Sequence, residues 1–141
     1  MTDTGDDLTV AEGTYPFQRL LGFRMLGWSE NRARFELPIA EHLFNRYGIP
    51  HGGVYATILD TVMGYSGCYT GDAERRSLAM TLSLTTNFLS RPTGSLMIAE
   101  GWRTGGGNST FFAEGRVTDE NGTLLATGSG TFRYRRPAAR S

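Results

Sequence analysis

Hydrophobic and polar residues change their spacing along the chain, and each change marks a new element. Over residues 23–39 they alternate, which is typical of a strand with one buried face. The apolar members of this alternation are Ala33, Phe35, Leu37 and Ile39. We expect them to lie on the second strand of a hairpin that turns near residues 29–31 and ends at Pro38.

A short helix is predicted before the hairpin, over residues 15–21, because Phe17, Leu20 and Leu21 fall on one helical face. Gly22 is placed to end it. We expect residues 1–14 to form a flexible acidic tail and residues 137–141 to form a C-terminal tail. Residues 15–136 then form a single domain.

Residues 52–69 have helical spacing instead, and they follow a loop over residues 42–50. The apolar residues that recur at this spacing are Val54, Ile58, Val62 and Tyr65, with Leu59 and Met63 beside them. The pattern predicts one helix from about Gly52 to about Tyr69. Because this helix is apolar on nearly all sides, we expect it to be buried.

The rest of the chain alternates again and predicts strands. The first of them contains Leu78, Met80, Leu82 and Leu84 in alternation with small or polar residues. Three more strands are expected over residues 95–103, 110–119 and 123–135, joined by turns at 105–108 and 120–122. One apolar helix and an antiparallel sheet predict an α+β fold in which the curved sheet wraps the helix. The free edges of such a sheet favour a homodimer or a larger homo-oligomer.

Composition and charge narrow the classes of function. The chain has 141 residues, of which 39% are hydrophobic, as expected of one packed domain. Its 14 basic residues balance its 14 acidic residues, which disfavours nucleic acids and membrane surfaces as partners. No apolar run approaches the roughly 18 residues of a membrane span, and no signal-peptide pattern is visible. We therefore expect a cytoplasmic protein.

The residue types also exclude several cofactors. All 14 basic residues are arginine, so the chain has no lysine for Schiff-base or P-loop chemistry. Cys68 is the single cysteine, and His42 and His51 are the two histidines. Neither a disulfide within the chain nor a metal site is therefore expected. Cys68 is interpreted as a small core residue.

Asp60 is the single charged residue between Tyr47 and Gly71. It lies in the apolar part of the predicted helix, where burial of a carboxylate costs on the order of several kcal/mol unless the group is paired or hydrogen-bonded. Two interpretations stay open at this point. Asp60 is either a reactive carboxylate or one that bonds to a neighbouring strand or subunit for structural reasons.

The run His51-Gly52-Gly53 stands at the start of the same helix. Free backbone N–H groups and the positive end of the helix dipole meet at such a start, and glycine leaves them accessible to a ligand. These donors are suited to a developing oxyanion. The simpler interpretation is a tight turn that carries a loop histidine.

Residues 45–60 read Asn-Arg-Tyr-Gly-Ile-Pro-His-Gly-Gly-Val-Tyr-Ala-Thr-Ile-Leu-Asp. This run resembles the signature of hotdog-fold acyl-CoA thioesterases of the phenylacetate-degradation (PaaI-like) type. Residues 84–92 resemble the family's strand after the helix, and residues 119–132 resemble its last hairpin. The resemblance implies a hotdog fold and the hydrolysis of an acyl- or aryl-CoA thioester to a free acid and CoA. It implies no cofactor beyond the coenzyme A of the substrate.

The resemblance also implies roles for the residues of the motif. The Gly53 N–H would polarise the thioester carbonyl, with Gly52 beside the substrate. Asp60 would act as general base on water or as direct nucleophile, and Asn45 and His51 would orient water or the leaving sulfur. In the family, Asp60 and the Asn-His-Gly group come from different subunits. A homodimer is therefore expected, and a homotetramer built from two such dimers.

Residues outside the motif are implied as further contacts. Thr81 is expected to be the hydroxyl residue beside Asp60, with Ser83 on the same strand face as the alternative. Many relatives carry an arginine near the CoA phosphates where this chain has Thr-Gly-Gly-Gly-Asn-Ser at residues 104–109. Arginine suits phosphate, and the candidates in this chain are Arg91, Arg103, Arg133, Arg135 and Arg136.

Two other functions stay open on the same fold, since function depends on the site and not on the fold. One is a protein that binds acyl-CoA without cleaving it, although binding alone does not need a buried carboxylate such as Asp60. The other is an enoyl-CoA hydratase or dehydratase, whose usual Asp-x-x-x-x-His segment is not present in this sequence.

Overall fold

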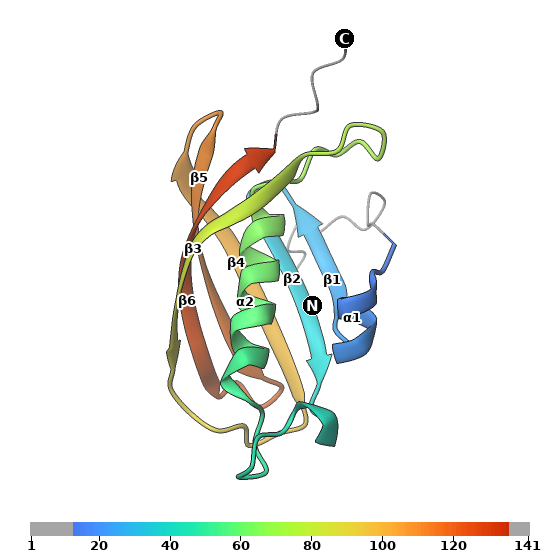
Figure 1. Ribbon diagram of the computed structural model, residues 1–141, viewed down its shortest axis with the longest axis vertical. Coiled ribbons are helices and arrows are strands. Elements are labelled where there is room, and N and C mark those ends of the chain that lie inside the picture. The colour runs from blue at the N-terminus through green and yellow to red at the C-terminus, as the bar shows by residue number, and fades with distance from the viewer. Residues whose placement is uncertain (1–12, 136–141) are drawn as a thin grey trace.

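The computed structural model describes residues 13–135, in which one long helix packs inside a curved antiparallel sheet (Figure 1). This confirms the predicted fold class. The predicted tails lie almost wholly outside the described residues. The elements in chain order are α1 (Pro16–Leu21), β1 (Arg24–Ser29), β2 (Arg32–Pro38), the 3-10 helix η1 (Glu41–Leu43), α2 (Gly52–Ser66), β3 (Leu78–Phe88), β4 (Leu96–Gly106), β5 (Thr110–Asp119) and β6 (Leu124–Arg135).

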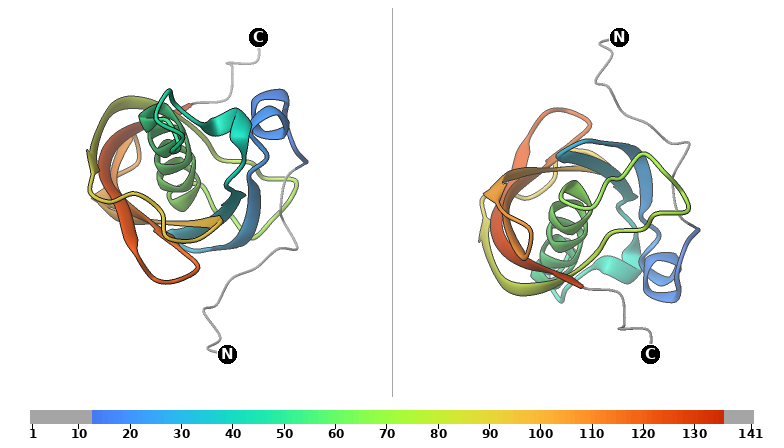
Figure 2. Two further views of the ribbon diagram at one scale, coloured as in Figure 1. Left: turned by 90° about the horizontal axis from the view of Figure 1, so that it is seen from below. Right: turned by 90° about the horizontal axis from the view of Figure 1, so that it is seen from above.

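The sheet has six strands in the order β1-β2-β4-β5-β6-β3, and all neighbours are antiparallel. It curves around α2, as the views along the helix show (Figure 2). β1 and β3 are its two edges and do not pair with each other. The predicted hairpin of β1 and β2 is confirmed, and Asn31 takes the left-handed conformation at its turn, with φ of 62°.

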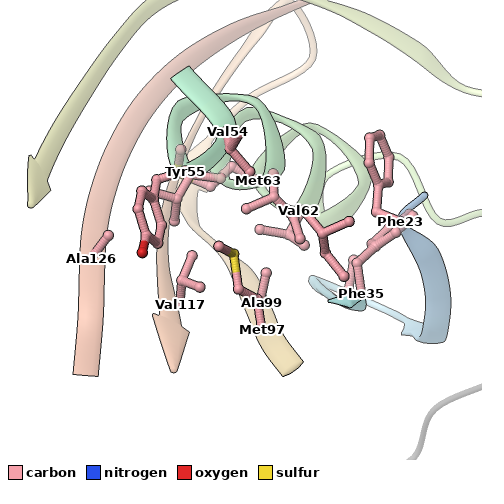
Figure 3. Close-up of a cluster of buried hydrophobic side chains, with 14 of the residues drawn as sticks. Phe23, Phe35, Val54, Tyr55, Val62, Met63, Met97, Ala99, Val117 and Ala126 are labelled. Carbon is pink, nitrogen blue, oxygen red and sulfur yellow. The ribbon is translucent and has the colours of Figure 1, made fainter. Parts of the chain in front are cut away.

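One face of α2 supplies the centre of the core. Its buried side chains pack against those of the inner face of the sheet (Figure 3), and they include Val54, Ile58, Leu59, Val62 and Met63. Burial of each such side chain stabilises the fold by about 1.5–3 kcal/mol. The prediction of a buried helix is confirmed on this face. The face that carries Thr57, Asp60 and Gly64 is only partly buried, because the sheet is open between its two edges.

Glycine allows the helix and the sheet to approach closely. A Cβ on Gly101 in β4 would overlap the Val62 carbonyl oxygen of α2. A Cβ on Gly115 in β5 would lie 3.2 Å from both Leu59 Cδ2 and Met63 Cγ. These close approaches hold α2 deep in the concave face, so any larger residue at Gly101 would push the helix outward.

The helix ends at Ser66 and not near Tyr69 as predicted. Long-range contacts made by side chains of the sheet set this end. The Trp28 Nε1–H donates to the Tyr65 carbonyl oxygen at 2.9 Å, and the Tyr134 hydroxyl donates to the Gly67 carbonyl oxygen at 2.7 Å. Both donors therefore satisfy carbonyl groups at the end of the helix, where the last four carbonyl groups have no donor within the helix.

In α1 and in β3, the apolar side chains that the sequence pattern places on one face do not point into the core. In α1, Gln18 is buried, whereas Phe17 and Leu20 are exposed. In β3, the residues Leu78, Met80 and Leu82 are exposed. A bulge between Thr81 and Ser83 breaks the alternation of this strand, so the small or polar residues before the bulge face α2 in place of the apolar ones.

No helix within residues 13–135 combines the length and the apolar character needed to cross a membrane.

Asp119 fixes the turn between β5 and β6 at the end of the sheet. Its carboxylate is buried and accepts hydrogen bonds from the backbone N–H groups of Thr93, Gly94, Asn121 and Thr123 and from the Thr93 hydroxyl. Burial alone would raise the pKa of Asp119, but these donors outweigh burial and lower the pKa to about 2.

We expect Asp119→Asn to lower the melting temperature at pH 7. The folded chain holds the pKa of Asp119 below the ordinary value of 3.8, so the charge stabilises the fold above that pH. This stabilisation is lost as the pH falls through about 2. The gap in melting temperature between wild type and variant should therefore close between pH 4 and pH 2. A gap that does not change with pH, or an equal gap for the surface variant Glu114→Gln, would contradict this assignment.

Candidate active site

Asp60 lies in the middle of α2, on the face that the sheet leaves uncovered. Its Oδ1 accepts a hydrogen bond from the Thr81 hydroxyl of β3 at 2.6 Å. Such short bonds between a hydroxyl and a carboxylate are among the stronger ones in proteins. The structure therefore brings together two of the predicted site residues, and the second Asp60 oxygen keeps its lone pairs for other partners.

Ser83 is not on the same strand face as Thr81. Thr81 pairs with Phe132, which is buried beneath α2, whereas Ser83 pairs with Thr131, the preceding residue of β6. Residues paired across strands share a face, and neighbours along a strand do not. The bulge between Thr81 and Ser83 thus turns the Ser83 side chain away from Asp60, which corrects the expectation that Ser83 could replace Thr81.

The start of α2 is capped by the side chain of His51. His51 Nδ1 accepts the Gly53 N–H at 2.8 Å, and the His51 carbonyl accepts the Val54 N–H at 2.9 Å. A Cβ on Gly53 would lie 3.1 Å from His51 Nδ1, so glycine permits this close cap. An imidazole that accepts at Nδ1 carries its proton on Nε2.

The cap changes which backbone donor is available at the helix start. The Gly53 N–H, which the sequence predicts as the free donor, is already paired with His51. The preceding N–H, that of Gly52, makes no hydrogen bond within residues 13–135. The first N–H groups of a helix have no acceptor within it, so Gly52 presents the open donor unless the His51 ring turns away.

Asn45 organises the loop that leads into α2. Its side-chain oxygen accepts the Tyr47 N–H at 2.8 Å, and its backbone N–H donates to the Ile49 carbonyl at 2.8 Å. Its NH₂ group has no partner within the described part of the chain and is left as a donor. Asn45 therefore shapes this loop in addition to any contact with a ligand.

Two cavities separate the predicted residues into two groups. Asp60 and Thr81 line one cavity of about 230 Å³. Asn45, Gly52 and Arg91 line another of about 420 Å³ at the N-terminus of α2. Asp60 lies seven positions after Gly53 in the helix, which is about 10 Å along the axis. One chain therefore does not bring the carboxylate and the helix-start donors to a single reacting atom.

Apart from Tyr65, which the sequence suggests as a core residue or a ligand contact, the rest of the cavity beside Asp60 is lined by residues that the sequence did not identify as part of a site. Its other walls are Tyr15, Trp28, Thr61, Gly64, Tyr65, Cys68, Ser77, Leu78, Ala79 and Phe132. They come from the chain before α1, from β1, from α2, from the segment between α2 and β3, from β3 and from β6, so only the fold brings them together. The predicted core residue Cys68 is buried and also reaches this cavity.

The cavity at the helix start is partly aromatic. Tyr55 and Phe88 line it, with their ring centroids 6.2 Å apart. Burial, and secondly the charge of Asp119, raise the pKa of Tyr55, so its hydroxyl stays protonated at neutral pH. Phe88 lies against Gly52, where a Cβ would be 3.4 Å from the ring. Glycine therefore leaves the open N–H accessible beside an apolar wall.

The candidate arginines lie in different places. Arg91 joins Asn45 and Gly52 in the cavity at the helix start. Arg103 lies on β4, where its guanidinium donates to the Gly107 carbonyl at 3.5 Å. Its Nε is buried and has no hydrogen-bond partner among residues 13–135. Arg133 and Arg135 line a third cavity with Met80, Ser109 and Tyr134. Arg136 lies outside the described residues.

Within residues 13–135, no three His, Cys, Asp or Glu residues come together in a way that would hold a metal ion.

Residues 47–126, more than half of the chain, match the family model described as the thioesterase superfamily. No curated protein matches the chain.

Among solved structures, a conserved protein of Pseudomonas aeruginosa is 25% identical, with a TM-score of 0.77 over 86% of this chain and 95% of that one. A Bacillus halodurans protein solved with CoA is 26% identical, with a TM-score of 0.74 over 90% and 82%. The PaaI protein of the phenylacetic acid degradation operon of E. coli is 17% identical and shares the fold, with a TM-score of 0.74 over 85% and 84%.

We expect His51→Ala to lower the free energy of unfolding by about 1 kcal/mol, because the variant removes the acceptor that caps the Gly53 N–H. Urea denaturation at neutral pH measures this change. His51→Asn keeps a side-chain acceptor at the same position and should restore most of the lost stability. Equal stability of wild type and both variants would show that the cap does not hold in solution.

Proposed function

The chain belongs to the thioesterase superfamily, and we propose on that premise that it hydrolyses an acyl-CoA thioester to a free acid and CoA. The observation that carries the proposal is the Asp60 carboxylate, held by the Thr81 hydroxyl at 2.6 Å and facing a cavity on the uncovered face of α2. The similarity to the Bacillus halodurans protein solved with CoA supports a CoA thioester as the substrate.

Asp60 has two chemical routes in this proposal. As general base it takes a proton from water while the water oxygen attacks the thioester carbonyl carbon. As nucleophile its own oxygen attacks that carbon, and water then hydrolyses the resulting anhydride. In both routes the C–S bond breaks and the sulfur leaves as the thiol of CoA. The Thr81 hydrogen bond to Oδ1 orients the carboxylate and leaves Oδ2 for the reaction.

The donors at the start of α2 are proposed to stabilise the negative charge on the carbonyl oxygen. The Gly52 N–H is open, and the Gly53 N–H joins it if the His51 ring turns away. One such donor contributes about 100- to 1000-fold in rate. Asn45 and His51 flank these donors and are proposed to orient water or the leaving sulfur.

A second copy of the chain is proposed to complete the site. Asp60 and Gly53 are separated by about 10 Å within one chain, so the carbonyl needs a helix start from another protomer. The 11-residue strand β3 is a free edge beside α2. Antiparallel pairing of two β3 edges about a twofold axis would place two α2 helices antiparallel, with the start of one near the middle of the other. A homotetramer stays a prediction.

The proposal also includes a type within the family and a ligand for the CoA phosphates. The motif over residues 45–60 supports the PaaI-like type and a role in the hydrolysis of acyl- or aryl-CoA esters. Arg91 is favoured as the phosphate ligand because it lies beside Asn45 and Gly52. Arg103 is a weaker candidate, because its guanidinium is directed at the Gly107 carbonyl.

We expect Asp60→Asn to reduce kcat by about 100- to 10,000-fold, the usual effect of losing a general base. The amide cannot take the proton and is a poor nucleophile. A thiol-release assay with a panel of acyl-CoA esters measures this loss, and the melting temperature checks that the fold is kept. Glu114→Gln, which removes a surface carboxylate, should keep the wild-type rate. Wild-type turnover by Asp60→Asn would remove the proposed mechanism.

Mixing Asp60→Asn and His51→Ala protomers should restore activity that neither variant has alone. In a mixed dimer one site carries both changes and the other carries none. Random exchange makes about half of the dimers mixed, so about a quarter of the wild-type activity should return. The assay follows activity after unfolding and refolding the two variants together. Verified mixed dimers without activity would count against a site shared between protomers.

A further inference from the structure

We propose that the convex face of the sheet carries a docking surface for membranes that contain anionic phospholipids. The surface lies where the start of β3, the end of β6 and the start of β5 come together. The inference goes beyond the proposed thioesterase function, because the side chains of this surface take no part in the proposed reaction. We call the surface the convex patch, and its members are Leu78, Met80, Leu82, Phe112, Arg133 and Arg135.

The strand register places the patch on the face turned away from α2, which lies inside the curve of the sheet (Figure 2). Leu78 pairs with Arg135, and Met80 pairs with Arg133. Cross-strand partners share a face, and Phe132, the residue before Arg133, is buried in the core. These four patch residues therefore point outward, on the side opposite to Phe132.

The apolar members of the patch lie on both sides of β6. Thr131, two residues before Arg133, pairs with Phe112 of β5, so Phe112 continues the same face. Leu82 lies in the bulge of β3, on the other side of β6. The exposed fractions of the four apolar side chains range from 43% to 55%. Such a group of exposed apolar side chains is typical of an interaction surface.

The arginines of the patch lack the partners that other arginines of the convex face have. Arg32 and Arg116 both form ion pairs with Glu100. Arg133 and Arg135 are exposed, and neither has an ion-pair partner among residues 13–135. The 14 basic and 14 acidic residues of the chain cancel overall, but the patch keeps two unbalanced positive charges. An anionic partner would balance them.

A cavity beside these arginines suits the phosphate of a lipid headgroup. It has a volume of about 280 Å³ and is lined by Met80, Ser109, Arg133, Tyr134 and Arg135. Guanidinium groups bind phosphate through paired hydrogen bonds, and the Ser109 hydroxyl is a further donor. Phosphate donors with the apolar Met80 beside them match the headgroup and the upper acyl carbons of a phospholipid.

The charge and the shape of the patch disfavour other occupants. In a twofold contact with a second copy the patch would meet itself, and arginine would face arginine. A peptide helix binds in a hydrophobic groove, whereas the cavity at the patch holds about 280 Å³. A membrane surface needs no groove. If two β3 edges pair as proposed above, both patches lie on the same side of one continuous sheet, so a single membrane can bind both.

Co-sedimentation of the full chain with vesicles tests the proposal without any substrate, so failure of the proposed thioesterase function would not affect it. One set of vesicles contains phosphatidylcholine alone, and the other contains an equal mixture with phosphatidylglycerol. The variants are Arg133→Gln, Arg135→Gln and Met80→Ser, and melting temperatures check that each is folded. Arg46→Gln is the matched control, because Arg46 is also exposed but precedes α2, at the other end of the helix from the patch (Figure 1).

We expect wild type to bind the vesicles that contain phosphatidylglycerol and not those of phosphatidylcholine alone. Raising NaCl from about 0.1 M to about 1 M should release it, since the Debye length falls from about 10 Å to about 3 Å. One arginine near an anionic surface contributes about fivefold in affinity. Arg133→Gln and Arg135→Gln should each weaken binding by about fivefold, or about 25-fold if a dimer binds through both patches. Met80→Ser should weaken binding by about threefold or more, and Arg46→Gln should match wild type.

Binding to neither kind of vesicle, equal binding to both, or equal affinity of wild type and Arg133→Gln would overturn the proposal. Sedimentation velocity without lipid tests a second copy as the occupant. A wild-type oligomer that Met80→Ser dissociates, with no binding to either kind of vesicle, would show that the patch binds a second copy and would also overturn the proposal.

Discussion

Close packing of one face of α2 against the concave sheet is the interaction on which the rest of the structure depends. Gly101 and Gly115 let β4 and β5 approach the helix, while the edges β1 and β3 stay apart. Asp60 therefore lies on the face that the sheet does not reach, with Thr81 on the edge strand beside it. The opening that exposes the carboxylate also creates the cavity next to it.

Two carboxylates of the chain show how the number of hydrogen bonds separates structural from reactive roles. Asp119 accepts bonds from four backbone N–H groups and one hydroxyl, and its pKa falls to about 2. Within residues 13–135, Asp60 accepts one bond, from Thr81. A carboxylate that is fully hydrogen-bonded has little capacity left to accept a proton or attack a carbon. Asp60 keeps that capacity, which suits the role proposed for it.

Local pattern predicted the elements of this fold, but not the features that only distant residues create. The hairpin of β1 and β2 and the start of α2 follow from spacing. The contact between Thr81 and Asp60 follows from the family resemblance of residues 84–92. The end of α2 depends on Trp28 and Tyr134, which lie far away in the sequence. The bulge that separates Thr81 from Ser83 has no sequence signal, since both residues continue the same alternation. The walls of the cavity come from six parts of the chain.

The His51 cap makes the geometry of the helix start depend on one lone pair. The Nδ1 lone pair that accepts the Gly53 N–H is the same lone pair that a second proton on the imidazole would occupy. A doubly protonated His51 has no acceptor to offer, so the Gly53 N–H is released and a second backbone donor opens beside Gly52. Nδ1 of His51 can therefore either cap the helix or carry a proton, but not both. The protonation state of His51 thus determines whether one or two backbone N–H groups are open at the start of α2.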